Sequence, residues 1–207
     1  MKRFFKPRAV NIILILNCLV YVAWHLPGVV STEFMVQNFL VSWTALADGR
    51  DWTLLTSVFS HTSFMHFFIN MYVFIGFGGF IERILGFRTF IKFYLAAGIF
   101  SSLCHALVSY FLLDKPDLPA LGASGAISGV IILFALMFPK EKILILGFIP
   151  IPALAGALVA VGLDLWGLSA QAGGGGLPIG HGAHLGGALA GAIFYFYMLR
   201  RARIRRA

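Results

Sequence analysis

The sequence predicts an all-α fold, namely a polytopic membrane bundle of six transmembrane helices with a partly inserted first outer loop. Three observations lead to this fold class. Of the 207 residues, 59% are hydrophobic and only 12% are charged, about half of the ~25% charged residues usual in soluble domains. Several apolar segments approach the ~20 residues that a membrane-spanning helix needs. Basic residues gather between these segments. We expect one membrane domain over residues 1–207.

The six expected spans are the longest apolar segments of the chain. The first follows Lys2, Arg3, Lys6 and Arg8 and resembles a secretory signal, but no small-residue cleavage site follows it, so we expect a retained helix. The fourth is short and is expected to start partway down the membrane. Helices are expected because an open sheet leaves unpaired backbone groups in lipid. The spans cover residues 9–26, 62–80, 89–113, 124–138, 143–168 and 181–199.

The basic residues predict the orientation of the bundle. With a cytoplasmic N-terminus, fourteen of the 16 lysines and arginines fall on the cytoplasmic side, and only Arg50 and Lys115 fall outside. This distribution follows the positive-inside rule and places both termini in the cytoplasm. The net charge of +8 is therefore a topology signal, and we expect no nucleic-acid partner. Cys18 and Cys104 both lie in apolar segments, which favours small packing residues over a disulfide framework.

Two outer connections have unusual compositions. Residues 27–61 form a long connection that includes Trp43 and Trp52, which favours an interfacial or half-inserted structure beside the bundle. Residues 171–180 contain four consecutive glycines and Pro178 directly before the last helix. Glycine has little conformational preference. This segment is either a mobile lid or a flexible connector, and the sequence favours neither.

A serine lies among glycines at the head of the fourth span, in the run Gly122-Ala123-Ser124-Gly125. The glycines at 122, 125 and 129 could simply form a helix-packing face, since membrane helices often carry small residues where they touch. A polar loop precedes the run, however, so Ser124 is expected near water at the outer end of a helix. A helix N-terminus supplies free N–H donors and a positive dipole end, which stabilise an oxyanion.

A histidine lies in a comparable glycine setting in the last span. His184 shares a helix face with Gly187 and Gly191, three and seven residues further on. We expect this face to pack closely on Gly125 and Gly129. Close packing could bring the imidazole within the ~2.6–3.2 Å that a general base needs from a hydroxyl. The alternative is a histidine that only packs between helices.

The second span carries a polar pair, His66 and Asn70, four residues apart and therefore on one helix face. Both side chains can donate hydrogen bonds, so together they could stabilise a tetrahedral oxyanion. The alternative is interhelical hydrogen bonding. For His61 we expect that hydrogen-bonding role or exposure to water at the outer surface.

The remaining polar residues point to no metal and no cofactor. The histidines include no His-Glu-x-x-His motif, and His181 and His184 alone are too few for zinc. His25 and His105 are expected to be structural. Asp164 could orient a catalytic histidine, but we expect it to cap or brace the end of its helix.

These motifs together resemble the rhomboid intramembrane serine proteases of the minimal six-helix type, over nearly the whole chain. The resemblance rests on four motifs in this order along the chain: His66 with Asn70, then Glu82-Arg83-Ile84-Leu85-Gly86, then Gly122-Ala123-Ser124-Gly125, then Ala183-His184 with Gly187 and Gly191.

The resemblance implies a Ser–His dyad without an essential aspartate. Ser124 would be the nucleophile and His184 the general base, while His66, Asn70 and the Ser124 N–H would form the oxyanion hole. The five glycines, Glu82 and Trp52 would be structural or gating residues. The chain differs from common members at two positions. Thr53 follows Trp52 where arginine is frequent, and Ser128 replaces an aromatic residue.

The sequence thus predicts an endopeptidase that cuts membrane-protein substrates in or near their transmembrane segments. A non-catalytic relative that binds membrane proteins for quality control is the alternative. A transporter or channel is disfavoured, because the predicted spans contain almost no charged residues besides Asp164. A bacterial plasma membrane is the expected location. The sequence leaves the oligomeric state open.

Overall fold

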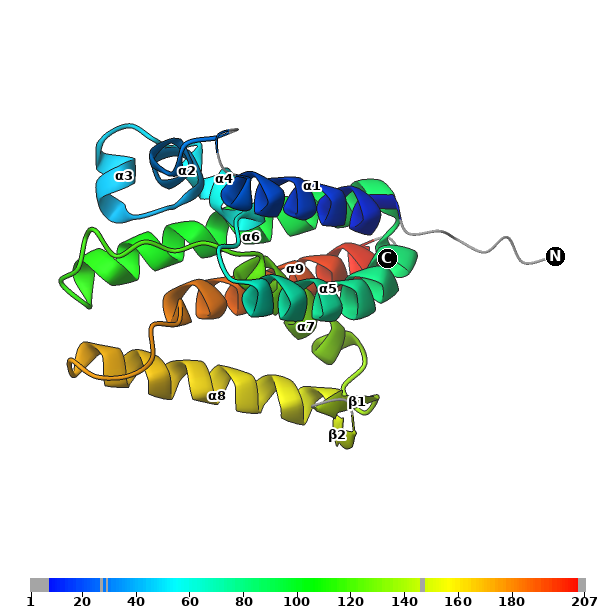
Figure 1. The fold of residues 1–207 in the computed structure, drawn as a ribbon. Helices are drawn as coiled ribbons and strands as arrows, with labels where there is room; N and C mark the ends of the chain where they lie inside the picture. The colour runs from blue at the N-terminus through cyan, green and yellow to red at the C-terminus, as the bar shows by residue number, and fades with distance from the viewer. Residues whose placement is uncertain (1–7, 27, 29, 146–147, 205–207) are drawn as a thin grey trace.

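The computed structural model describes residues 8–26, 28, 30–145 and 148–204 as a bundle of long helices. The long helices run roughly along one direction (Figure 1). The start of α1 and the end of α9 lie at the same end of the bundle, which agrees with two termini on one side of the membrane. The long helices are α1 (Arg8–His25), α5 (Phe64–Leu85), α6 (Phe87–Phe111), α7 (Ser124–Met137), α8 (Ala153–Ala172) and α9 (His181–Ile204).

The architecture confirms the predicted fold class, an integral membrane bundle of helices. Within the described residues, five helices are long and apolar enough to cross a membrane, namely α1, α5, α6, α8 and α9. Helix α7 is apolar but has only 14 residues, as expected for a span that starts partway down the membrane. Counting α7 as the sixth span stays a prediction.

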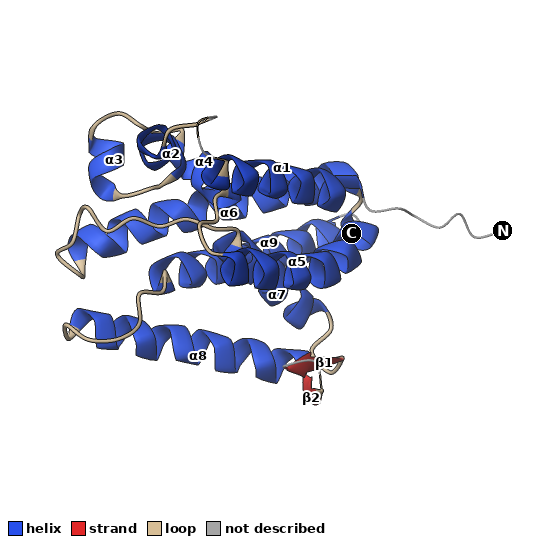
Figure 2. Ribbon diagram, in the orientation of Figure 1, coloured by secondary structure: helices blue, strands red, loops and turns tan. Residues whose placement is uncertain are grey.

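Several helices differ in extent from the predicted spans; α8 ends at Ala172 rather than at 168, and α9 ends at Ile204 rather than at 199. The second span continues past Phe80 to Leu85, where Gly86, at a φ of 75°, ends α5 and caps α6. The fifth span begins at Ala153 rather than at 143. The preceding residues form an antiparallel hairpin of β1 (Lys142–Ile145) and β2 (Ile149–Pro152) (Figure 2). Pro150 and Pro152 lack the N–H that a helix interior requires, so the helix starts only after them.

The first outer connection is folded, as its composition predicted. It contains four short helical segments and lies at the end of the bundle opposite the start of α1 (Figure 1). Trp43 stacks on Tyr110 of α6 with ring centroids 4.4 Å apart. Val41 and Ala120 form an isolated antiparallel bridge that joins this connection to the segment before α7. The four segments are α2 (Thr32–Phe39), α3 (Trp43–Ala47), α4 (Thr53–Thr56) and the 3-10 helix η1 (Ser57–Phe59).

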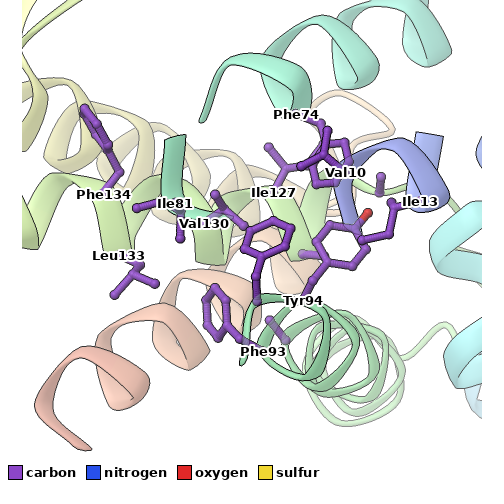
Figure 3. Close-up of a cluster of buried hydrophobic side chains, with 14 of the residues drawn as sticks. Val10, Ile13, Phe74, Ile81, Phe93, Tyr94, Ile127, Val130, Leu133 and Phe134 are labelled. Carbon is purple, nitrogen blue, oxygen red and sulfur yellow. The ribbon is translucent and has the colours of Figure 1, made fainter. Parts of the chain in front are cut away.

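A buried apolar cluster joins α1, α5, α6 and α7 (Figure 3). Phe74, Phe90 and Tyr94 are fully buried and pack against one another. Val130 and Leu133 of α7 are also fully buried, which places α7 inside the bundle. Helices α5, α6, α8 and α9 all contact α7, and its Gly125 and Gly129 are buried.

Glu82 attaches the first helix to this core. Its carboxylate oxygens accept the backbone N–H groups of Arg8, Ala9 and Val10 at 2.8–2.9 Å. These are the N–H groups at the start of α1 that have no partner within a helix. The side chain is fully buried. The predicted structural role of Glu82 is therefore that of an N-cap supplied by a distant helix.

Candidate active site

The turn before α7 fixes the position of Ser124. Gly122 has a φ of 113°, a conformation that favours glycine. A Cβ at this position would also lie 2.7 Å from Cε1 of His66. The N–H of Gly122 donates to the carbonyl of Ser57 at 2.8 Å, which holds the turn against η1. Glycine is thus required both for the backbone angle and for space beside the His66 ring.

The glycine faces of α7 and α9 meet as their spacing predicted. A Cβ on Gly129 would lie 2.9 Å from the carbonyl oxygen of Gly187. A Cβ on Gly187 would overlap the carbonyl oxygen of Gly125, and one on Gly191 would overlap that of Gly129. Gly125 also faces Ser101 of α6. The two backbones approach this closely only because these residues have no side chains.

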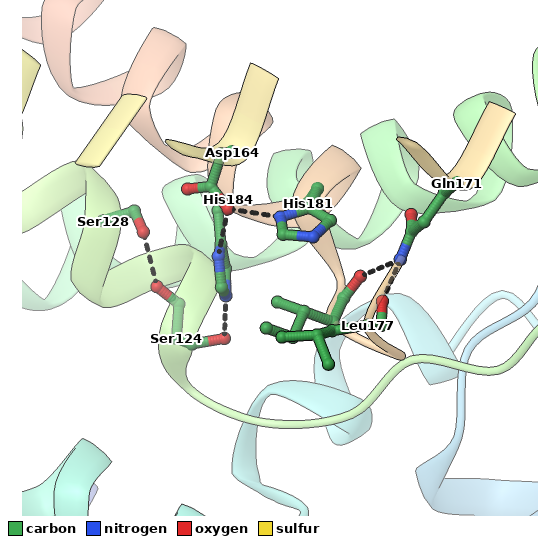
Figure 4. A network of polar contacts seen from close by, with 8 residues as sticks. Ser124, Ser128, Asp164, Gln171, Leu177, His181 and His184 are labelled. Atoms are coloured by element: carbon green, nitrogen blue, oxygen red, sulfur yellow. Dashed lines mark hydrogen bonds and ion pairs between the residues drawn. The ribbon is translucent and has the colours of Figure 1, made fainter. Parts of the chain in front are cut away.

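This contact brings Ser124 and His184 together. The Ser124 Oγ lies 2.8 Å from Nε2 of His184, within hydrogen-bonding distance (Figure 4). On the other side of the imidazole ring, Nδ1 lies 3.0 Å from Oδ1 of Asp164. A neutral imidazole that donates from Nδ1 to the carboxylate leaves Nε2 free to accept the serine proton. The geometry therefore favours the tautomer that a general base needs.

The contact between Asp164 and His184 corrects the expected role of Asp164. Asp164 lies within α8 rather than at its end, and its carboxylate reaches His184 instead of capping the helix. His184 thus contacts both Ser124 and Asp164, and the dyad without an essential aspartate that the resemblance implied stays a prediction. The sequence offered one signal for this contact, a lone acidic residue in an apolar span, which in a membrane usually faces a polar partner.

His181 is a second partner of the same carboxylate that sequence reasoning missed. Its Nδ1 lies 2.7 Å from Oδ1 of Asp164, and the residue is buried. Its ring fills the space beside Gly167, where a Cβ would overlap it. Asp164, His181 and His184 place one potential metal-ligand atom each within 4.8 Å of one another. The sequence analysis did not predict this cluster, because Asp164 lies on a different helix from the two histidines.

A cavity of about 680 Å³ opens in front of Ser124 and His184. His66 and Asn70 line it, so the structure brings all four predicted site residues to one space. The Nδ2 of Asn70 donates to the carbonyl of His66 at 2.8 Å. An amide nitrogen carries two hydrogens, so a second one is available for the cavity. Trp52 lies elsewhere, where its Nε1 donates to Asn38 of α2 at 3.0 Å.

The other histidines have structural settings. His61 is fully buried rather than exposed to water, and its Nε2 accepts the N–H of Ala123 at 3.4 Å. Burial, together with the nearby charge of His66, lowers the pKa of His61 to about 3, despite an opposing backbone hydrogen bond. It is therefore neutral at physiological pH and can accept this bond. The ring of His105 bonds to the carbonyl of Leu118, and that of His25 to the carbonyl of Tyr21.

The glycine-rich segment before α9 borders the same cavity. Pro178, Ile179 and Gly180 line the cavity beside His184. The Nε2 of Gln171 donates to the carbonyls of Leu177 at 2.7 Å and Ile179 at 2.8 Å (Figure 4). The side-chain amide of Gln171 thus joins this segment to the end of α8. Its role as a lid stays a prediction.

The helical membrane bundle thus holds a serine paired with an imidazole beside a cavity. Comparison with known proteins agrees: the family model described as the Rhomboid domain matches residues 48–201. The chain belongs to the rhomboid family.

Three relatives show how far the similarity extends. RHOMBOID-like protein 12, mitochondrial, of Arabidopsis thaliana is 32% identical over 93% of this chain and 59% of the relative. Presenilin-associated rhomboid-like protein A, mitochondrial, of Danio rerio is 33% identical over 92% of this chain and 48% of the relative. Rhomboid protein 1, mitochondrial, of Saccharomyces cerevisiae is 31% identical over 98% of this chain and 58% of the relative. The chain spans about half to three fifths of their length.

Proposed function

We propose that this protein is an intramembrane serine endopeptidase, with Ser124 as nucleophile and His184 as general base. The observation that carries the proposal is the 2.8 Å contact between the Ser124 Oγ and the His184 Nε2 beside an open cavity. Membership of the rhomboid family supports the same class of activity. The substrates would be membrane proteins cut in or near a transmembrane segment.

In the proposed reaction, His184 removes the Ser124 proton as the oxygen attacks a peptide carbonyl carbon. The protonated imidazole then donates that proton to the departing amine, which leaves an acyl-enzyme. A water molecule, deprotonated by His184, releases the acyl group and restores the serine. Asp164 acts as a positioning residue, because its contact with Nδ1 holds the ring and stabilises the imidazolium.

The oxyanion of each tetrahedral intermediate would be stabilised at the start of α7. Ser124 is the first residue of this helix, so its N–H has no acceptor within the helix. His66 and Asn70 line the same cavity and supply side-chain donors. Donors placed in advance in a site of low dielectric constant lower the barrier, and removing one typically costs ~10²–10³ in rate.

The test is labelling by a fluorophosphonate serine probe together with cleavage of a reporter transmembrane segment. We expect Ser124→Ala and His184→Ala to abolish both signals. Ser169→Ala, an exposed serine on α8, and His25→Gln serve as matched controls that keep both signals. Labelling of Ser124→Ala at the wild-type rate would overturn the proposed nucleophile.

The same experiment separates the protease from the non-catalytic alternative. A binding factor would retain its affinity for membrane proteins yet show no labelling in the wild-type chain. The serine and histidine pair argues for the protease, because a binding factor has no need for a hydroxyl aligned with an imidazole nitrogen.

The protein is an integral membrane protein, and the membrane in which it lies is a separate proposal. Residues 1–207 form one membrane domain with both termini on the side that carries fourteen of the 16 basic residues. That side is the cytoplasm in a bacterial plasma membrane, the location predicted from the sequence. The relatives reported above are named as mitochondrial proteins. The bacterial location stays a prediction.

A further inference from the structure

A second cavity, of about 770 Å³, lies between α6 and α9, away from Ser124 and His184. Its floor is apolar and includes Phe93 and Phe194, whose rings stack with centroids 4.6 Å apart. Ala96 of α6 and Ile193 of α9 are exposed on its walls. The cavity is therefore a groove on the lipid-facing surface of the bundle. We call it the α6–α9 groove.

Three cations gather at one end of the α6–α9 groove. Arg88 and Lys92 are four residues apart near the start of α6 and so share a face. Arg201 comes from the end of α9, which runs antiparallel to α6, and its guanidinium lies 5.9 Å from the ring centroid of Tyr197. Among the described residues, no aspartate or glutamate lines the groove. The start of α6 adds free N–H groups and the positive end of a helix dipole.

We propose that the α6–α9 groove binds one anionic phospholipid. The headgroup phosphate contacts Arg88, Lys92 and Arg201, and an acyl chain lies along the apolar floor. Positive charge at one end and an apolar remainder match the two halves of such a lipid. From Arg88 to Phe100 the α6 wall is ~18 Å long at 1.5 Å per residue, comparable to one leaflet of a hydrocarbon core ~30 Å thick.

The bound lipid would connect the two helices that support the candidate active site from behind. Helix α6 contributes Ser101 against Gly125, and α9 carries His184. A lipid seated between α6 and α9 stabilises their packing at the basic end of the bundle. The lipid proposal does not depend on the proposed protease function, because it concerns binding and stability rather than cleavage.

The test measures lipid binding by native mass spectrometry of the full chain in detergent. We expect one dioleoylphosphatidylglycerol to bind in preference to dioleoylphosphatidylcholine. In a triple variant, Arg88→Gln, Lys92→Gln and Arg201→Gln, we expect the affinity for the anionic lipid to fall on the order of 100-fold, since each basic residue near an anionic surface contributes roughly fivefold.

A matched control removes the same number of charges outside the groove, with Arg83→Gln, Lys140→Gln and Arg200→Gln. This control should bind the anionic lipid as the wild type does. Ala96→Phe fills the groove without changing charge and should also weaken binding. Equal weakening by both triple variants, equal binding of the two lipids, or unchanged binding by Ala96→Phe would overturn the proposal.

Discussion

Asp164 is the residue that most changes the chemistry expected of this chain. One carboxylate oxygen faces Nδ1 of His184 at 3.0 Å and Nδ1 of His181 at 2.7 Å. Both rings can donate to it, so the carboxylate fixes the orientation of the proposed base and is itself fixed by His181. Holding the base in this way limits the search for the reactive rotamer and tautomer.

We expect Asp164→Asn to reduce kcat by at least ~10-fold and at most the ~10⁴-fold seen when a triad carboxylate is replaced by an amide. The reason is that an asparagine can turn its N–H₂ toward Nδ1 and favour the wrong tautomer. The measurement is steady-state cleavage of a reporter segment, with KM and the midpoint of thermal unfolding followed in parallel. Both should change little.

The control is Asp48→Asn, which changes an exposed carboxylate paired with Arg50 and should leave kcat unchanged. An Asp164→Asn variant with wild-type kcat, or with a loss explained entirely by KM or by unfolding, would contradict the positioning role.

The sequence predicted Ser124 and His184 but not their link to Asp164. Ser124 and His184 each lie in a short glycine motif that is visible in the sequence. Asp164 lies 20 residues before His184 on another helix, and its reach depends on how α8 packs against α9. Only tertiary packing decides which polar groups in a bundle meet.

At the scale of elements, the close pairing of α7 and α9 determines whether the site forms. Gly187 faces the carbonyl oxygen of Gly125, and Gly129 faces that of Gly187. Backbone lies against backbone, so an added methyl group has no flexible side chain to displace. A shift of either helix would separate the Ser124 Oγ from the His184 ring.

We therefore expect Gly187→Ala to destabilise the fold by about 1–3 kcal/mol, the usual cost of overpacking, and to reduce cleavage more than lipid binding. The matched control is Gly162→Ala in α8, where an added Cβ meets no atom within 4 Å. This control should gain about 0.5–1 kcal/mol from helix propensity. The midpoint of thermal unfolding in detergent measures the stability of both variants. Equal midpoints for Gly187→Ala and Gly162→Ala would refute the predicted role of the glycine contact.

Hydropathy predicted the helices but could not separate a helix from the β1–β2 hairpin. Ile143, Leu144 and Ile149 continue the apolar pattern of α8, so a sliding window extends the span through them. Pro150 and Pro152 are the sequence signal against a helix here, because proline lacks the N–H that a helix interior requires. The end of α5 was missed for a related reason, since the chain remains apolar on both sides of Glu82 and Arg83.

For the whole molecule, the charge distribution predicts orientation. Lys115 lies in the connection before α7, and Lys140 lies in the connection after it. Because α7 separates these connections, we expect them on opposite sides of the membrane. In a chain with Cys18 and Cys104 replaced by alanine, Lys115→Cys should react with an impermeant maleimide in intact cells.

Under the same conditions, Lys140→Cys should react only after the membrane is disrupted. Equal labelling of the two positions in intact cells would show that α7 does not separate two aqueous compartments. The reverse pattern would show that the orientation is inverted, which would place the cavity beside Ser124 on the cytoplasmic side.

The bond between Glu82 and the start of α1 has a consequence for assembly. The cap lies 72 residues beyond Val10 in the chain. During synthesis the first helix therefore enters the bilayer with its leading amides unmatched, and it obtains its native anchor only after α5 has been inserted beside it. Helix α1 is thus completed by a helix made after it, and we expect the two helices to gain stability together.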